Sequence, residues 1–290
     1  MISPYLESIL IFVGINTILA LGNFIPYSAG LHSLGQAGFM AVGAYTAALL
    51  TKEFSVPFLP AILAGGGLAW VVGFLVGLPV LRVRGLYLVL VTWGFAEAIR
   101  IILLNLEYVG GPGGIGGIYP STNLLTVYVC IFLLIIFCLR LQNSRIGRAF
   151  QAVDMNQEAA EAMGVDLTKI KLTAFSLGAF ICGIGGGLYA HYALYIEPSN
   201  FNFFRSAEIL FFCVLGGGAT FVGPIVGAII FTIFPEIFRF LHDWRVVFFG
   251  FVLIGMMIFR PQGLVSRDLY NITLGLLGKV LRGERSPVGK

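Results

Sequence analysis

The sequence predicts an all-α protein, a polytopic transmembrane helical bundle of about nine spans (eight to ten). Hydrophobic residues make up 58% of its 290 residues and charged residues only 11%, whereas a soluble domain has roughly 25% charged residues. Mean hydropathy is +0.93. Apolar runs recur along the whole chain, each long enough to cross about 30 Å of hydrocarbon. We therefore take residues 1–290 as a single transmembrane domain.

Charged residues, proline and glycine divide the apolar runs. The predicted spans lie near 5–25, 28–50, 58–81, 86–106, 123–139, 171–195, 207–221, 224–241 and 246–259. The seventh run is short and continues into three glycines, so we expect a broken or re-entrant helix there. No Lys or Arg precedes the first run, and for that reason we do not expect a cleaved signal peptide.

Basic residues predict the orientation in the membrane. They gather within 82–84, 140–171 and 260–290, which fall on one side of the predicted bundle. Cytoplasmic loops are rich in Lys and Arg, so we expect these three segments in the cytoplasm. With nine spans, the amino terminus then lies outside the cell and the carboxyl terminus inside.

The polar interval 140–171 is the longest between spans, and it predicts a cytoplasmic helix at about 146–165. Its apolar residues recur three, four or seven positions apart and form one narrow face: Phe150, Val153, Ala160, Met163 and Leu167. Such a helix could lie passively on lipid headgroups, but anionic lipid favours a basic polar face. Because Glu158 and Glu161 make this polar face acidic, we favour a partner protein.

An EAA triplet, Glu158, Ala159 and Ala160, lies on this helix and is followed by Gly164. Alanines give a slim, stable helix that fits a groove, Glu158 offers a charge to a basic rim, and glycine ends a helix. The segment resembles the EAA loop of ABC importer permeases, the coupling helix that docks on the ATP-binding subunit. The resemblance implies that Glu158, Ala159, Ala160 and Gly164 couple this chain to an ATPase.

Further segments narrow the resemblance to one family. They are SLGQAGF at 33–39, LRVRGLYL at 81–88, GGPGGI at 110–115, GGGATFVGP at 216–224 and FRPQGL at 259–264. With them, the chain is similar over nearly its whole length to branched-chain amino-acid ABC importer permeases of the LivM type. One departure from the family's pattern is Gly113, where such permeases often have Asn.

The resemblance implies a permease subunit that moves leucine, isoleucine and valine by alternating access. Its expected partners are a homologous second permease subunit, two ABC ATPase subunits, an extracytoplasmic solute-binding protein and the lipid of a prokaryotic inner membrane. The sequence contains no G-x-x-x-x-G-K-[ST] phosphate loop, so ATP and Mg²⁺ are expected on the ATPase and no cofactor on this chain. Urea or short amides are alternative solutes.

Polar groups inside spans are costly and are therefore candidates for a solute path. Ser33 and Gln36 stand beside Gly38 in the second span, where an opened backbone could meet a zwitterion. Hydrogen bonding between helices explains the same residues. Gly111, in an outer loop, and Gly217, in the glycine run after the seventh span, complete the candidates; a flexible connector and close helix packing are their alternatives.

Other ionisable residues are read as structural. Glu97 and Arg100 are three positions apart and predict an ion pair on one helix, while lone His32 and His191 are typical of hydrogen-bonded interface residues. Three further observations exclude function classes. The sequence lacks the chain of acidic residues expected of a proton-driven transporter. It also lacks the H-E-x-x-H motif or paired carboxylates of an enzyme or a metal site, and the basic groove that binds nucleic acid. A stand-alone secondary transporter or channel would have no use for the EAA helix.

Overall fold

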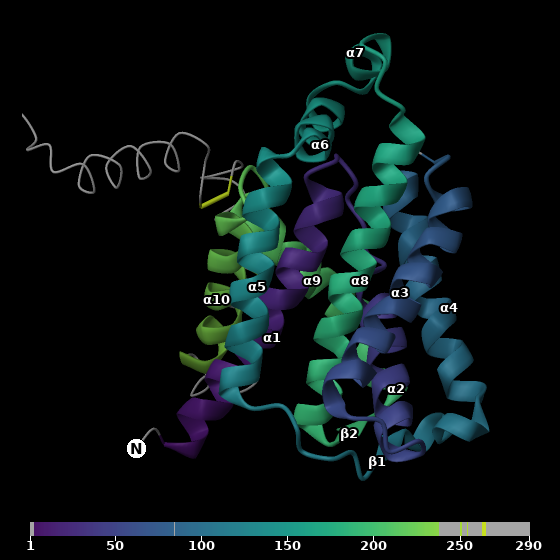
Figure 1. Cartoon of the computed structure of the whole chain (residues 1–290), viewed down its shortest axis with the longest axis vertical. Helices are drawn as coiled ribbons and strands as arrows, with labels where there is room; N and C mark the ends of the chain where they lie inside the picture. The colour runs from purple at the N-terminus through teal and green to yellow at the C-terminus, as the bar shows by residue number, and fades with distance from the viewer. Residues whose placement is uncertain (1–2, 84, 238–249, 251–253, 255–262, 265–290) are drawn as a thin grey trace, which may run out of the picture.

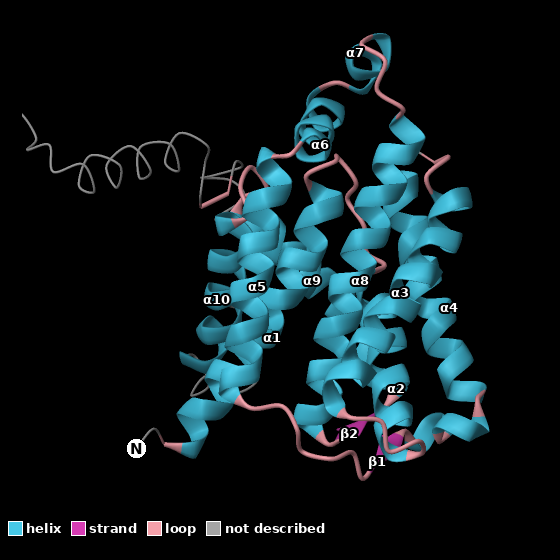
Figure 2. Ribbon diagram, viewed as in Figure 1, coloured by secondary structure: helices cyan, strands magenta, loops and turns pink. Residues whose placement is uncertain are grey.

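The computed structural model describes residues 3–83, 85–237, 250, 254 and 263–264. It is a bundle of helices that run mostly lengthwise beside one another (Figures 1 and 2). The α-helices are α1 (Pro4–Tyr27), α2 (Gln36–Lys52), α3 (Phe58–Val80), α4 (Leu86–Asn105), α5 (Leu124–Asn143), α6 (Arg145–Met155), α7 (Gln157–Ala162), α8 (Leu167–Ala193), α9 (Phe203–Gly216) and α10 (Val222–Ile237). The predicted all-α membrane fold is confirmed.

The two ends of the bundle differ in structure. At one end lie α6 and α7, and at the other lies a small antiparallel pair of strands, β1 (Ile115–Gly116) with β2 (Tyr195–Ile196) (Figure 2). Short 3-10 helices η1 (Glu107–Val109), η2 (Gly111–Gly113) and η3 (Pro198–Phe201) flank the strands in the chain. We call these the α6–α7 end and the β1–β2 end.

Five of the described helices are long and apolar enough to cross a membrane: α1, α3, α4, α5 and α8. α10 is a shorter apolar helix. The predicted ninth span, 246–259, falls almost wholly outside the described residues. The count of nine therefore stays a prediction.

The second predicted span, 28–50, is only partly helical. Residues 28–35 are not α-helical, although Ser33 among them is fully buried, and α2 begins at Gln36. The backbone N–H of Leu34 donates to Thr92 Oγ1 of α4 (3.0 Å), and that of Gly35 donates to Ser33 Oγ (3.1 Å). These bonds satisfy donors that a broken helix leaves open, so non-helical backbone can lie inside the bundle.

The seventh predicted span is also interrupted. α9 ends at Gly216, where Gly217 has φ of 95° and turns the chain, and α10 begins five residues later at Val222. α10 then packs back along α9, since a Cβ added to Gly227 would lie 2.1 Å from the carbonyl oxygen of Phe212. This hairpin agrees with the expectation of a broken or re-entrant helix.

The core of the bundle forms around α8, which packs against α1, α2 and α3. Three glycines let α2, α3 and α8 touch backbone to backbone. A Cβ on Gly43 would lie 2.1 Å from the Gly183 carbonyl oxygen, and a Cβ on Gly65 would lie 2.7 Å from that of Gly43. Small residues permit this approach in lipid, where burial of apolar surface gives no gain.

Candidate coupling surface and solute path

The predicted coupling helix at 146–165 is two helices instead of one. α6 begins at Arg145, where the Ser144 hydroxyl accepts the N–H of Gly147 (3.1 Å), and ends before Asn156. Asn156 is extended, with φ of −159°, and its side-chain oxygen accepts the N–H of Ala159 (3.0 Å) to start α7. Asparagine favours helix caps over helix interiors because its side chain competes for backbone donors. That competition is the physical reason for the break.

The break also changes the expected apolar face. Phe150, Val153 and Ala160 are buried as predicted, but Met163 is 86% exposed. The predicted face assumed one straight helix, but the helical periodicity is interrupted at Asn156. Met163 comes after the end of α7 and so does not continue that face. The apolar face thus belongs mostly to α6, which packs on α5 and α8.

α7 protrudes farthest from the bundle at the α6–α7 end (Figure 1). Glu158 and Ala159 are exposed on it, whereas Ala160 is buried against the protein. Gly164 has φ of 85° and donates its N–H to the Glu161 carbonyl (2.9 Å), so it ends the helix as the sequence predicts. The EAA triplet therefore presents a small acidic surface to the surroundings.

One hydrogen bond joins α7 to α8, and a second one caps the start of α8. Lys171 is buried, and its ammonium donates to Gln157 Oε1 (2.8 Å). Asp166 caps α8 by accepting the N–H of Lys169 (3.0 Å), and this backbone hydrogen bond lowers the pKa of the Asp166 carboxyl. α7 is thus attached at its first turn, to α6 through Asn156 and to α8 through the hydrogen bond between Gln157 and Lys171.

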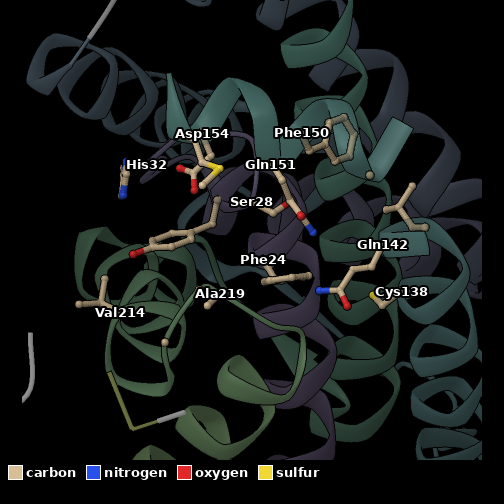
Figure 3. Close-up of a pocket in the computed structure, with 16 residues that line it drawn as sticks. Phe24, Ser28, His32, Cys138, Gln142, Phe150, Gln151, Asp154, Val214 and Ala219 are labelled. Atoms are coloured by element: carbon tan, nitrogen blue, oxygen red, sulfur yellow. The ribbon is translucent and has the colours of Figure 1, made fainter. Parts of the chain in front are cut away.

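A cavity of about 390 Å³ lies beneath α6. It is lined by the ends of α1 and α5, by α6 and by the turn between α9 and α10 (Figure 3). Its labelled lining residues are Phe24, Ser28, His32, Cys138, Gln142, Phe150, Gln151, Asp154, Val214 and Ala219. The wall is part apolar and part polar, so it suits a small solute with both characters.

Gln36 lies in a buried network that joins four helices. Its amide nitrogen donates to Asn23 Oδ1 of α1 (3.0 Å), and its amide oxygen lies 3.3 Å from the Cys182 thiol of α8. Asn23 in turn donates to the Ile209 carbonyl of α9 (3.3 Å). Gln36 is 1% exposed. In this conformation the amide serves interhelical hydrogen bonding, the alternative to lining a solute path.

The other solute-path candidates do not gather with Gln36 at one site. Ser33 is fully buried and bonds the backbone of residue 35, and Gly38 allows close packing on Ala96 of α4, 3.0 Å from an added Cβ. Gly111 lies in η2 near the β1–β2 end, whereas Gly217 lines the cavity at the opposite end. Whether any of them meets solute stays a prediction.

The structural reading is confirmed for Glu97, Arg100 and His191 and stays a prediction for His32. Arg100 Nε donates to Glu97 Oε1 (2.8 Å), and His191 is buried with its ring nitrogens on the Gly187 carbonyl (2.8 Å) and Thr51 Oγ1 (3.1 Å). His32 lies edge-on to the Tyr27 ring, at the rim of the cavity. Among the described residues, no three His, Cys, Asp or Glu side chains are placed to hold a metal ion.

Two asparagines of α1 escaped the sequence reasoning. Asn23 is fully buried at the centre of the network around Gln36, and Asn16 accepts a hydrogen bond from Arg205 (2.6 Å) and donates one to Thr232 (2.8 Å). Their signal was present, because an amide inside an apolar span needs a polar partner. For three of these bonds the partners lie 186 to 216 residues away in the chain, which no local pattern reveals.

Comparison with known proteins places these features in a family. Residues 5–259 match the family described as branched-chain amino acid transport system, permease component. The chain belongs to this permease family. It is 35% identical to the high-affinity branched-chain amino acid transport permease LivM of Salmonella typhimurium and to that of Escherichia coli, in each case over 86% of this chain and 67% of the relative.

A more distant relative has the same description. The probable branched-chain amino acid transport permease LivM of Methanocaldococcus jannaschii is 26% identical over 68% of this chain and 66% of its own length. No solved structure matches. The permease is therefore a multi-pass membrane transport component, and the resemblance inferred from the sequence motifs is confirmed.

Proposed function

We propose that this permease is the membrane subunit of an ATP-driven importer of branched-chain amino acids. The observation that carries the proposal is the protruding α7, with Glu158 and Ala159 exposed and Gly164 ending the helix. A short helix of this kind fits a groove on a partner protein. The partner is an ATPase that binds ATP and Mg²⁺, and this chain itself carries no cofactor.

The proposed mechanism is alternating access, coupled through α6. α7 and α6 are joined at Asn156, and α6 forms a wall of the cavity that also contacts Gly217 in the α9–α10 turn. A partner that moves α7 would therefore change the cavity and the turn together. The partner can shift the balance between conformations only by binding one of them more tightly.

The assembly and orientation follow from the same proposal. The α6–α7 end carries Arg82 and the basic cluster at 140–171 and lies in the cytoplasm of a prokaryotic cell, with the amino terminus outside and the carboxyl terminus inside. Two ATPase subunits, a homologous second permease subunit and an extracytoplasmic solute-binding protein complete the importer. The relatives' names state branched-chain amino acids, and the solutes proposed for this chain are leucine, isoleucine and valine.

The coupling role is tested by a charge reversal on α7. Glu158→Lys is expected to leave membrane insertion intact and to abolish solute-stimulated ATP hydrolysis by the reconstituted importer. Glu53→Lys is the matched control, because Glu53 is equally an exposed carboxylate but lies just past the end of α2, at the opposite end of the bundle. Normal stimulation in Glu158→Lys would refute coupling through α7.

The solute and the need for an ATPase are tested in the same reconstituted system. Uptake of radiolabelled leucine, with competition by valine and isoleucine, is expected to require ATP and the binding protein. Competition by urea or acetamide instead would support the alternative solutes. Robust uptake by the permease alone in liposomes would support a stand-alone transporter or channel and refute the ATP-driven proposal.

A further inference from the structure

Two ion pairs lie within the apolar part of the bundle and are only partly covered by protein. Arg100 and Glu97 of α4 keep 27% and 31% of their side chains exposed. In α9, Arg205 Nη1 lies 2.6 Å from Glu208 Oε2, and the two side chains are 16% and 29% exposed. Charged side chains in membrane spans are costly and nearly always face protein or water.

Both ion pairs lie too far from the ends of the bundle for the membrane surface to explain how their charges are accommodated. Glu97 is the twelfth residue of the 20-residue helix α4, about 16 Å from its first residue at 1.5 Å per residue. Arg205 donates to Asn16 (2.6 Å), which is the thirteenth of the 24 residues of α1. Arginine can reach an interface with its long side chain, but its glutamate partner at this depth cannot.

The two pairs belong to one surface of the permease. Trp93, one turn before Glu97 on α4, packs edge-on to Phe203 at the start of α9, with ring centroids 5.2 Å apart. Phe204, one turn before Glu208, is 78% exposed. We call the surface formed by these residues of α4 and α9 the α4–α9 face.

Other exposed faces have a different composition. α3 contains no charged residue, and α5 contains none until Arg140 in its last turn. Their exposed side chains are large and apolar, among them Leu63 and Leu75 on α3 and Phe132 on α5. These surfaces are suited to lipid, so the charged α4–α9 face is distinct from them.

We propose that the α4–α9 face contacts the second permease subunit and the water between the two subunits, while α3 and α5 face lipid. This inference rests on the proposed function, because it takes a paired permease as the partner. A helical membrane surface with hydrogen-bonding groups can cover Glu97, Arg100 and Glu208 without the cost of placing them in hydrocarbon. Lipid cannot.

The test compares two positions of equal exposure near the β1–β2 end of their helices. Ile101→Cys lies one turn after Glu97 and is 49% exposed, and Val129→Cys on α5 is 48% exposed. Each is made with Cys130→Ser, labelled with a nitroxide and studied by electron paramagnetic resonance in the complete importer in lipid nanodiscs. Phe204→Cys is labelled as a second probe of the face, in case substitution at Ile101 impairs folding.

Oxygen concentrates in lipid, so its collisions with the nitroxide report exposure to hydrocarbon. We expect the collision rates at Ile101→Cys and Phe204→Cys to be several-fold lower than at Val129→Cys. Equal rates at all three positions would overturn the inference. Solute-stimulated ATP hydrolysis is measured in the same samples. If solute stimulates hydrolysis but the oxygen collision rates are equal at all three positions, the α4–α9 face is refuted and the proposed function is not. If the labels at Ile101→Cys and Phe204→Cys have low collision rates but solute does not stimulate hydrolysis, the proposed function is refuted and the face is not.

Discussion

Replacing Gly43 by alanine tests the contact between α2 and α8. The added Cβ would lie 2.1 Å from the Gly183 carbonyl oxygen and 2.4 Å from its Cα, so the helices would have to separate by roughly 1 Å. Such overpacking costs about 1–3 kcal/mol, and the better helix propensity of alanine returns at most about 1 kcal/mol. We expect a net loss of roughly 1–2 kcal/mol in the free energy of unfolding.

The measurement is reversible unfolding of the purified permease in mixed micelles, with increasing sodium dodecyl sulfate. Gly67→Ala is the matched control, because a Cβ added to Gly67 of α3 has no neighbouring atom within 4 Å. The control is expected to be unchanged or slightly more stable. If Gly43→Ala and Gly67→Ala unfold at the same midpoint, the close approach of α2 to α8 is wrong.

Three further substitutions have definite expected outcomes. Gln36→Leu leaves the buried Asn23 oxygen without a donor and should cost about 1–3 kcal/mol of unfolding free energy, whereas Thr46→Val, which loses only a bond within its own helix, should change little. Gly164→Ala forces an L side chain to φ of 85° and should weaken the end of α7 by about 1 kcal/mol. Asparagine tolerates this backbone region, so Gly164→Asn should retain more solute-stimulated ATP hydrolysis than Gly164→Ala. Equal rates of hydrolysis in the two variants would contradict the role of the turn. Ser144→Ala removes the side-chain cap of α6, which is worth about 1 kcal/mol, and should speed hydrogen exchange of the Gly147 amide several-fold. An unchanged exchange rate at Gly147 would contradict the cap.

The sequence predicts most of the fold because the membrane restricts what the chain can do. Apolar runs of sufficient length have few alternatives to helices in lipid, so the predicted spans near 5–25, 58–81 and 86–106 agree with α1, α3 and α4 to within a few residues. Gly164 was also correctly expected to end its helix, because a positive φ at a helix terminus is a local property of glycine.

Features that depend on distant partners were harder to predict. The break at Asn156 carries a local signal, a capping residue, but an apolar period continued across it misplaced Met163. The pairing of Gln36 with Asn23 depends on how α1 and α2 pack, which composition does not specify. The cavity beneath α6 unites four separate segments of the chain, so only the folded structure reveals it.

The glycine contacts among α2, α3 and α8 constrain how this permease can move. Helices that touch backbone to backbone have no side chains between them to slide or exchange rotamers, so these three are expected to travel as a rigid block. The bending points then fall where the chain leaves helical geometry inside the bundle, at residues 28–35 and 217–221. Both segments adjoin the cavity, so the expected bending points and the cavity lie in the same part of the permease.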